Sequence, residues 1–459
     1  MDSTHIDELR AQFRGPLIGP ADPSYDEARA VNNGMIDRRP ALIVRCADTA
    51  DVITAVRLAR DEGLEVSVRG GGHNVNGFAV NDGGLVIDLS GMTGVRVDPV
   101  SRIARVEGGA TWGDLDHATH AYGLATTGGI ISTTGVGGLT LGGGIGHLAR
   151  GCGLSCDNLL SADVVTADGR VVVTSEKEHP DLFWALRGGG GNFGVVTSLE
   201  FRLHPVDTIY GGPIFYEMSQ LREALTFYRE FMHSAPPELG AFFGFHRAPP
   251  LPFIPADRVD EPMCVIVVCY TGDHDTGAKL VNPLIELGPP VGHHVGPMPY
   301  PALQSAFDAL IPPGLQHYWK AEMFNEITDE VIDAHERFAP GVPHVSSAVH
   351  IYPIDGAPHQ VGATDTAFSY RDARYATVIA AMYPDPADNE ANRAWVRDYW
   401  AALRPNSAGG PYVNFAMRDE GDDRVAAIYR DNYDRLRAVK AAYDPGNLFR
   451  QNQNITPSS

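Results

Sequence analysis

Three dense clusters of glycine constrain the fold of this chain more than any other feature of its sequence. Fifty of its 459 residues are glycine, and the clusters fall within the first 200 residues: RGGGHN at 69–74, GGIISTTGVGGLTLGGGIG at 128–146 and GGGGNFG at 188–194. Because glycine lacks a Cβ atom, such segments adopt positive φ angles and bring successive backbone N–H groups against an anionic ligand. Tight turns are the alternative, but three clusters between strand-like runs favour a site for a large, anionic, partly flat ligand.

Charge and cysteine content narrow the class of protein. Fifty-seven Asp and Glu residues outnumber 36 Lys and Arg residues, so the net charge is −21, and we expect no nucleic-acid partner and no membrane partner. The five cysteines form no CxxC pair and the histidines no HExxH pattern, which predicts neither a disulfide framework nor a metal site. The first twenty residues contain acids and no long apolar run, which predicts a cytoplasmic protein.

Hydrophobic periodicity predicts alternating strands and helices in the first 205 residues. We expect strand, helix and strand over 41–66, with Asp48 or Thr49 as the helix cap, a helix over 112–120, and a hairpin over 162–175. After residue 205 the glycine clusters give way to amphipathic helices at 219–235 and 300–310 that alternate with strands at 265–270 and 345–354. A final helix is expected over 422–443.

Two nucleotide-binding motifs can be tested directly. No Gly-Lys-Ser/Thr sequence occurs, which excludes a Walker-type loop for ATP or GTP. Gly144-x-Gly146-x-x-Ala149 nearly matches the Rossmann fingerprint, but no convincing buried strand precedes it. An NAD(P) enzyme is therefore only a minor alternative.

Four segments together carry a resemblance to a known family: 69–92 (RGGGHNVNGFAVNDGGLVIDLSGM), 128–159, 182–197 (LFWALRGGGGNFGVVT) and 443–455 (YDPGNLFRQNQNI). In this order they resemble the FAD-linked oxidases of the vanillyl-alcohol-oxidase superfamily, in the berberine-bridge-enzyme-like branch. The resemblance implies an α+β fold: a PCMH-type FAD-binding domain in two α/β subdomains, with an inserted substrate domain built on an antiparallel sheet flanked by helices. The corresponding boundaries are 1–205 for the FAD-binding domain, 206–410 for the substrate domain, and 411–459 for a C-terminal segment that returns to the FAD-binding domain.

The resemblance also implies which residues bind FAD. His73 corresponds to the histidine that is bonded covalently to the flavin 8α-methyl group. Residues expected around the pyrophosphate are Arg69, Gly70, Gly71, Gly72, Asn74 and Gly77. Residues expected on the other side of the cofactor or along its adenosine half are Thr133, Thr134, Gly135, Gly138, Gly142, Gly143, Gly146, Gly194 and Val196. Asn414 is expected at the flavin edge, and Asn452 is a further expected contact. Ile131 stands where many members have a second, cysteinyl attachment, so a single histidyl link is expected.

The catalytic residues are less well defined by the resemblance. Positions that carry a tyrosine, glutamine or glutamate in related members correspond here to Val75, Ile145 and Val378, which are all apolar. Two polar candidates are left open. Tyr412 is a catalytic base or a packing residue, on a strand that would place it on the same face as Asn414. His350 is a base or hydrogen-bond donor, or a core histidine with its hydrogen bonds satisfied, on a strand that would place Tyr352 beyond it on the same face.

The function implied is an FAD-dependent oxidase that takes a hydride from a small, largely apolar molecule to flavin N5 and passes the electrons to O₂. Thr134 stands at a position associated with oxygen access, which favours an oxidase over a dehydrogenase. An alcohol, an amine or a phenol of the aromatic or polyketide type is the expected substrate. A flavoprotein that only binds its ligand and a dehydrogenase with another acceptor are the alternatives, and a homodimer is left open.

Overall fold

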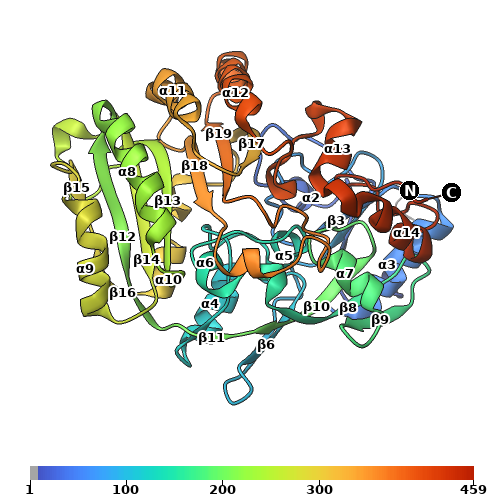
Figure 1. The fold of residues 1–459 in the computed structure, drawn as a ribbon. Helices are drawn as coiled ribbons and strands as arrows, with labels where there is room; N and C mark the ends of the chain where they lie inside the picture. The colour runs from blue at the N-terminus through green and yellow to red at the C-terminus, as the bar shows by residue number, and fades with distance from the viewer. Residues whose placement is uncertain (1–8, 459) are drawn as a thin grey trace.

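The computed structural model describes residues 9–458 and contains three main β-sheets (Figure 1). The first sheet has four strands in the order β1 (Leu17–Ile18), β2 (Leu42–Arg45), β4 (Leu85–Asp88) and β3 (Val66–Arg69). Strands β2 and β3 both run parallel to β4, and helix α3 (Thr49–Asp61) connects them. The Asp48 side chain caps α3 by accepting from the N–H groups of Ala50 and Asp51, so the strand, helix and strand expected over 41–66 are confirmed.

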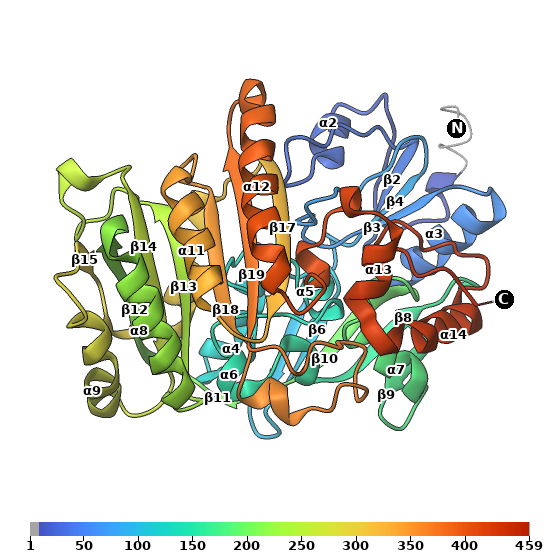
Figure 2. The ribbon, with the colours of Figure 1, turned by 45° about the horizontal axis from the view of Figure 1, so that its top comes forward.

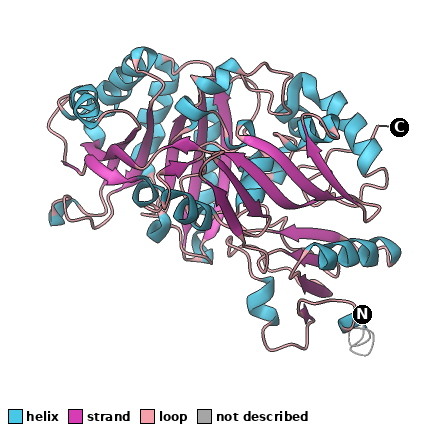
Figure 3. Cartoon of the chain, turned by 90° about the horizontal axis from the view of Figure 1, so that it is seen from below, coloured by secondary structure: helices cyan, strands magenta, loops and turns pink. Residues whose placement is uncertain are grey.

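The second sheet has five antiparallel strands and adjoins the glycine clusters. Its order is β5 (Val95–Asp98), β6 (Ile103–Glu107), β10 (Val195–Arg202), β8 (Leu159–Val165) and β9 (Val171–Ser175). The third glycine cluster leads directly into β10, and the first one follows β3. Figure 3 shows the N-terminal strands as a layer separate from the other strands. Short elements complete this half of the molecule: α2 (Tyr25–Arg29), α4 (Trp112–His120), β7 (Leu124–Ala125), α5 (Val136–Leu141), α6 (Ala149–Cys152), α7 (Pro180–Leu186) and β11 (His204–Pro205).

The third sheet has eight antiparallel strands. Its main order is β15 (Gly292–His293), β12 (Thr208–Glu217), β14 (Pro262–Tyr270), β13 (Leu239–Arg247), β18 (Ala348–Pro353), β19 (Tyr375–Tyr383) and β17 (Gln316–Phe324), and β16 (Gly296–Pro299) pairs with β12. Figure 2 shows one face of this sheet covered by α8 (Leu221–Ser234), α9 (His274–Ile285), α11 (Asp329–Phe338) and α12 (Asn389–Leu403). An antiparallel sheet flanked by helices is therefore present.

Alternation along the strands gives the eight-stranded sheet two different faces. On β19, Ile379 and Ala381 pack into the core under the helices, whereas Val378 and Ala380 point to the opposite face. Phe242 on β13 also belongs to that opposite face, where it packs with residues of the first 205. The sheet thus presents an inner face toward the glycine clusters.

Two of the expected helices are shorter than their sequence pattern indicated. The helix expected over 300–310 ends at Gln304 (α10, Tyr300–Gln304), and a separate turn covers 308–310, because Phe307 and Ile311 are drawn into a cavity wall. The helix expected over 422–443 is two helices, α13 (Asp422–Tyr429) and α14 (Tyr433–Tyr443). Arg430 between them has a φ angle of 47°, and the break lets Asn432 donate to the carbonyl groups of Ala363 and Thr366.

The last segment of the chain packs against the third glycine cluster. The buried Lys440 Nζ lies 2.7 Å from the carbonyl oxygen of Asn192, 3.0 Å from that of Phe449 and 2.5 Å from Asp444 Oδ2. The Asn192 side chain in turn accepts from the N–H of Ile455. A lysine with three acceptors therefore joins the end of the chain to the loop at 188–194.

Candidate active site

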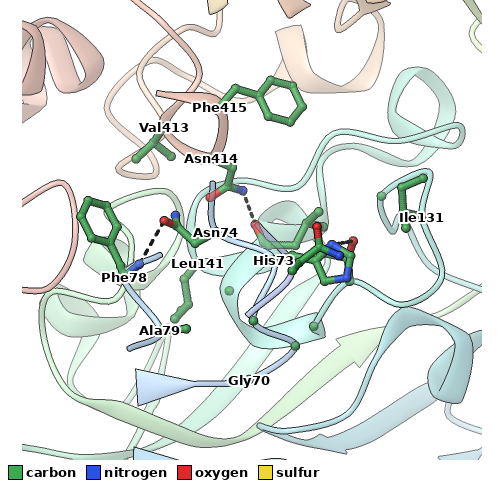
Figure 4. Close-up of a pocket in the computed structure, with 18 of the residues that line it drawn as sticks. Gly70, His73, Asn74, Phe78, Ala79, Ile131, Leu141, Val413, Asn414 and Phe415 are labelled. Atoms are coloured by element: carbon green, nitrogen blue, oxygen red, sulfur yellow. Dashed lines mark hydrogen bonds between the residues drawn. The ribbon is translucent and has the colours of Figure 1, made fainter. Parts of the chain in front are cut away.

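A cavity lies between the glycine clusters and the inner face of the eight-stranded sheet. One end is walled by backbone from 70–74, 135–138 and 190–194, and the other end by side chains from β13, β17, β18 and β19. Figure 4 shows part of the wall, with Gly70, His73 and Asn74 from the first cluster and Asn414 and Phe415 from the C-terminal segment. Residues far apart in the sequence therefore meet around a single space.

The first two glycine clusters contact each other through bare backbone. A Cβ atom added to Gly71 would lie 2.4 Å from the nitrogen of Gly135, and one added to Gly135 would lie 2.4 Å from the nitrogen of Gly71. Among the described residues, the N–H groups of Gly71, Gly72, His73 and Asn74 have no acceptor. Four successive donors at a cavity wall form an anion-binding concavity that needs no lysine.

His73 follows this concavity and is held by two threonines. Its Nε2 atom lies 3.0 Å from the Thr133 hydroxyl and its Nδ1 atom 3.4 Å from the Thr134 hydroxyl. Burial lowers the pKa of His73 to about 4, although the carboxylate of Asp308 opposes this shift. The imidazole is therefore neutral at physiological pH, and a neutral ring nitrogen is a competent nucleophile.

Most of the residues expected to bind the cofactor line the cavity. They are Gly70, Gly71, Gly72, His73, Asn74, Thr134, Gly135, Gly138, Gly194, Val196, Asn414 and Asn452. The Asn452 side chain also donates to the carbonyl of Gly191 at 3.1 Å. This hydrogen bond joins the C-terminal segment to the third glycine cluster at the cavity wall.

Six of the expected residues do not line the cavity: Arg69, Gly77, Thr133, Gly142, Gly143 and Gly146. Arg69 donates to the carbonyl of Ala28, and Thr133 is a neighbour of the His73 ring. A Cβ atom on Gly142 would lie 2.1 Å from Asn414 Oδ1, and one on Gly146 would lie 1.7 Å from the carbonyl oxygen of Gly128. At these two positions the missing Cβ atom allows neighbouring parts of the protein to pack closely.

The remaining two glycines are also packing positions. Gly77 has a φ angle of 66°, and a Cβ atom there would meet the Ile36 side chain at 2.6 Å. Gly143 has a φ angle of 123°, and a Cβ atom there would meet Phe368 at 2.9 Å. The near-Rossmann sequence is likewise not a nucleotide cradle, since it precedes a helix of only four residues.

The position of a second flavin attachment is occupied by an apolar side chain. Ile131 lines the cavity near His73 (Figure 4). All five cysteines lie in the described part of the chain, and none of them lines the cavity. No thiol is therefore available at the cavity wall.

Three polar side chains form a row at the end of the cavity beside the eight-stranded sheet. His246 Nε2 lies 2.6 Å from His350 Nε2, and His350 Nδ1 lies 2.6 Å from the Tyr352 hydroxyl. All three residues are buried and line the cavity. The sequence indicated His350, with Tyr352 on the same strand face, but it contained no signal for His246. Gly244 pairs with His350 across β13 and β18, so His246, two residues further on, meets His350 diagonally.

The surroundings keep this row uncharged. Burial lowers the pKa of His246 to about 4 and that of His350 well below 6.5, and the His246 and His147 imidazoles lower the pKa of His350 further. Burial also raises the pKa of Tyr352 above 10. At physiological pH the row therefore consists of two neutral imidazoles and a protonated phenol.

Tyr412 and Asn414 also meet at the cavity, but they do so through a turn. Residues 413–415 form a single 3₁₀ turn, in which the N–H of Phe415 donates to the carbonyl of Tyr412, so the strand expected here is wrong. The Tyr412 hydroxyl oxygen accepts from the Gly144 N–H at 2.7 Å and from Asn414 Nδ2 at 2.7 Å. The oxygen of Tyr412 thus already holds two donors.

The rest of this end of the cavity is largely apolar. Ile145 and Val378, two of the three apolar positions noted in the sequence, line the cavity, whereas Val75 does not. Phe307, Trp319 and Phe415 add aromatic surface. His317, which the sequence did not single out, lies beside His73, and burial together with the His73 imidazole lowers its pKa to about 4.

Within residues 9–458 we find no cluster of three or more His, Cys, Asp or Glu side chains suited to a metal ion. Nor does that part of the chain contain a helix with the length and apolar character needed to span a membrane.

Comparison with known proteins agrees with this geometry. Residues 40–175 match the family model of an FAD binding domain, and residues 411–456 match that of berberine and berberine-like proteins. The chain is 32% identical to (R)-6-hydroxynicotine oxidase of Paenarthrobacter nicotinovorans, over 97% of both chains. It is 31% identical to an FAD-linked oxidoreductase of Dictyostelium discoideum, over 91% of this chain and 89% of the relative.

Solved structures give the same result. The crystal structure of 6-hydroxy-D-nicotine oxidase from Arthrobacter nicotinovorans superposes with a TM-score of 0.85 at 30% identity and covers 97% of this chain and 98% of that one. A berberine-bridge-enzyme-like protein of Physcomitrella patens shares the fold, with a TM-score of 0.87 at 22% identity over 98% and 99% of the two chains. The fold and the site define an FAD-binding enzyme, and the chain belongs to the berberine-bridge-enzyme-like FAD-linked oxidoreductases.

Proposed function

We propose that this FAD-linked oxidoreductase is an oxidase of small, largely apolar alcohols, amines or phenols, with O₂ as the electron acceptor. The observation that carries the proposal is the composition of the cavity, in which a wall of free backbone donors continues into an apolar chamber with one row of polar side chains. One solved structure of the same fold is a chitooligosaccharide oxidase, at 25% identity. The aromatic and aliphatic wall here favours an apolar substrate over a sugar, because a sugar needs many polar partners.

The residues present fit FAD. The unpaired N–H groups of 71–74 would hold the pyrophosphate, and the third glycine cluster with Val196 and Asn452 would line the adenosine half. We propose that His73 forms one covalent bond to the flavin and that the cofactor has no cysteinyl link, because Ile131 stands where many related proteins carry the cysteine and no thiol lines the cavity. When bound, FAD supplies the hydride acceptor, and the protein supplies position and surroundings.

The two catalytic candidates receive different roles. The oxygen of Tyr412 accepts two hydrogen bonds, so its lone pairs are used and only its O–H proton is left to interact. We assign Tyr412 as a hydrogen-bond donor that faces the cavity. His350 has a nitrogen in contact with Tyr352 and no charge, so we assign the proton-accepting role to the row that contains it.

The experiment that tests the function is anaerobic mixing of the flavin-loaded protein with candidate alcohols, amines and phenols. An enzyme's flavin loses its yellow absorbance when a substrate reduces it, whereas a protein that only binds the ligand shows a shifted spectrum. Admission of O₂ then separates an oxidase, whose colour returns with formation of H₂O₂, from a dehydrogenase that needs a dye as acceptor. If no compound bleaches the flavin, the proposed oxidation is wrong.

The covalent link has its own test. Acid precipitation of the flavin-loaded protein should give a yellow pellet, and His73→Ala should give a colourless pellet with the flavin in the supernatant. Thr133→Val is a matched control, because it removes a neighbour of the ring and leaves the imidazole in place. A His73→Ala pellet that stays yellow would show that another residue carries the flavin.

A further inference from the structure

The row formed by His246, His350 and Tyr352 is a continuous pair of hydrogen bonds in an aromatic enclosure. The Phe242 ring lies 4.8 Å from the His350 ring, and the Phe307 ring lies 5.9 Å from the His246 ring. No other side chain or backbone group in the described part of the chain bonds to these three side chains. The only neighbour left for the Tyr352 hydroxyl is therefore a molecule in the cavity, whose wall Tyr352 helps to form.

The two hydrogen bonds of the row must point in the same direction. A neutral imidazole has one N–H and one bare nitrogen. If Tyr352 donates to His350 Nδ1, the His350 proton is on Nε2 and is donated to His246 Nε2. In the opposite order, His246 donates to His350 and His350 donates to Tyr352. The phenol is a stronger donor than a neutral imidazole N–H, and a bare imidazole nitrogen is a stronger acceptor than a phenol oxygen. The first order is therefore the more stable one.

In this order the oxygen of Tyr352 offers its free lone pair to the cavity. We propose that the row is a proton relay that accepts the O–H or N–H proton of the substrate at Tyr352, with His246 as the residue that sets its direction. The proposal rests on the proposed oxidation. It assigns Tyr352 as the group that touches the substrate and His246 as a positioning residue that acts through His350.

The proton and the electrons can be followed through one oxidation of an alcohol. The substrate O–H bond breaks, and its proton goes to the Tyr352 oxygen. The former Tyr352 proton goes to His350 Nδ1, and the His350 Nε2 proton goes to His246 Nε2, which becomes an imidazolium. FAD, held by the glycine clusters and His73, would supply the acceptor for the hydride of the adjacent C–H bond, so the substrate would lose two electrons and gain a C=O bond. The proton would remain on His246 as the imidazolium.

The relay defines a substrate class. A ligand must bring a hydrogen-bond donor, which primary and secondary alcohols, phenols, and primary and secondary amines have, whereas ethers and tertiary amines do not. Tyr412 also lines the cavity, and the proposed function assigns it as a donor. One tyrosine would thus donate to a bound group and the other would accept from it.

The test uses two probes that bind without turnover. The first is 4-nitrophenol, which has an O–H but no C–H on the oxygen-bearing carbon, and the second is 4-nitroanisole, in which a methyl group replaces the donor. Their affinities for the anaerobic, flavin-loaded protein are measured by equilibrium dialysis at a pH where the free phenol is un-ionised. One net hydrogen bond predicts that the wild-type protein prefers the phenol by about 2-fold to 10-fold.

Variants of the relay locate that preference. Tyr352→Phe removes the acceptor, so the two affinities should become equal. His246→Leu removes the group that directs the His350 proton and should reduce the preference, whereas His246→Gln, whose amide oxygen can accept from His350 Nε2, should restore it. Flavin content and thermal unfolding verify that each variant is folded. If His246→Leu does not fold, Tyr352→Phe, which removes a single oxygen atom, still tests the relay. An unchanged preference in Tyr352→Phe, or equal preferences in His246→Leu and wild type, would overturn the relay.

A second readout separates this proposal from the proposed function. If a donor-bearing compound bleaches the flavin, His246→Leu should slow the bleaching and change its solvent deuterium isotope effect, and His246→Gln should restore both. If no compound bleaches the flavin, the oxidation fails while the affinity ratio still reports on the Tyr352 acceptor. If the wild-type protein does not prefer the phenol while a compound still bleaches its flavin, the proposed oxidation stands and the relay is wrong.

Discussion

The two ends of the cavity are built from different parts of the chain. At the cofactor end, Gly71 and Gly135 approach so closely that neither could carry a Cβ atom, and the polar groups are backbone N–H. At the substrate end, the polar groups are side chains that stand on alternate positions of paired strands, such as His246 on β13 and His350 on β18. The polar groups of the cofactor end therefore depend on the path of the backbone, whereas those of the substrate end can be replaced by substituting one side chain at a time.

The cofactor end and the substrate end also differ in their electrostatics. A chain of net charge −21 can hold an anionic dinucleotide because backbone donors attract the phosphates at short range. The substrate end instead contains neutral imidazoles and phenols, since burial suppresses their charged forms. We therefore expect substitutions at the first end to alter cofactor loading and substitutions at the second end to alter turnover.

The largest effect is expected for Gly71→Ala. The added methyl group would lie 2.4 Å from the nitrogen and 2.8 Å from the Cα of Gly135, so the two clusters must separate and the backbone that carries the four unpaired N–H groups must move. We expect the purified protein to contain almost no flavin, as measured by the ratio of flavin absorbance to protein absorbance.

Gly296→Ala is the control for that substitution. Gly296 lies in β16 and does not line the cavity, and a Cβ atom there would meet nothing within 4 Å. It should load flavin like the wild type. Normal loading of Gly71→Ala would break the comparison, because the cofactor end would then tolerate a side chain.

The next effect concerns Lys440, which joins the end of the chain to the loop at 188–194. Lys440→Met leaves Asp444 buried without its cation and removes a donor from the carbonyl groups of Asn192 and Phe449. Loss of one partner of a buried pair costs about 3–5 kcal/mol, which denaturant unfolding measures. Arg437→Ala on the same helix is the control: its pair with Asp434 is exposed, at 3.9 Å, and its loss should cost at most about 1 kcal/mol. Equal losses of unfolding free energy in the two variants would show that the Lys440 contacts add no more stability than a surface ion pair.

A third effect concerns a buried carboxyl group outside the cavity. Asp116 on α4 is fully buried beside Gln304 on α10, whose Nε2 lies 3.2 Å from Asp116 Oδ2. Burial raises the pKa of Asp116 to about 7. Because the folded value exceeds the unfolded value of 3.8, its contribution to stability is complete below about pH 4 and is lost as the pH rises through 7.

Asp116→Asn removes this titration. Its unfolding free energy relative to wild type should increase between pH 5 and pH 8 by at most about 3 kcal/mol, because about two of the pH units that separate the two pKa values lie in this interval. Thermal unfolding at the two pH values measures the change, and Asp114→Asn, at an exposed position of the same helix, should show none of it. A difference that is constant with pH would mean that Asp116 is ionised in the folded protein.

The sequence predicted much of the cofactor end because its signals are local. Glycine density located the clusters, Asp48 marked the start of α3, and the motif order implied FAD. It did not distinguish glycines that face the cavity from those that pack against the protein, since both roles require a missing Cβ atom. Gly142 and Gly146 were assigned to the cofactor for that reason, and their neighbours Asn414 and Gly128 become visible only in three dimensions.

The substrate end was harder to predict because its contacts depend on strand register. His350 and Tyr352 share a strand, and alternation placed them on one face. His246 is 104 residues away from His350 in the sequence, and only the pairing of β13 with β18 brings the two imidazoles together. The breaks after Gln304 and at Arg430 were missed for a similar reason: helical periodicity continues through both, while tertiary contacts of Phe307 and Asn432 end the helices.

The smallest effect is expected for Tyr412→Phe, which sharpens the comparison at the point where the two ends meet. The substitution removes the O–H that we assign as a donor to the substrate, and it leaves the Gly144 N–H and one Asn414 N–H without their acceptor. Loss of one donor predicts that kcat/KM falls about tenfold, with flavin content unchanged.

The control is Tyr429→Phe, which should leave kcat/KM near the wild-type value. Tyr429 is another buried residue of the cavity, and its hydroxyl makes a single 3.3 Å bond to the carbonyl of Gly189. Loss of a general base instead costs about 100-fold to 10,000-fold. A drop of that size in Tyr412→Phe would return the proton-accepting role to Tyr412 and take it away from the histidine row.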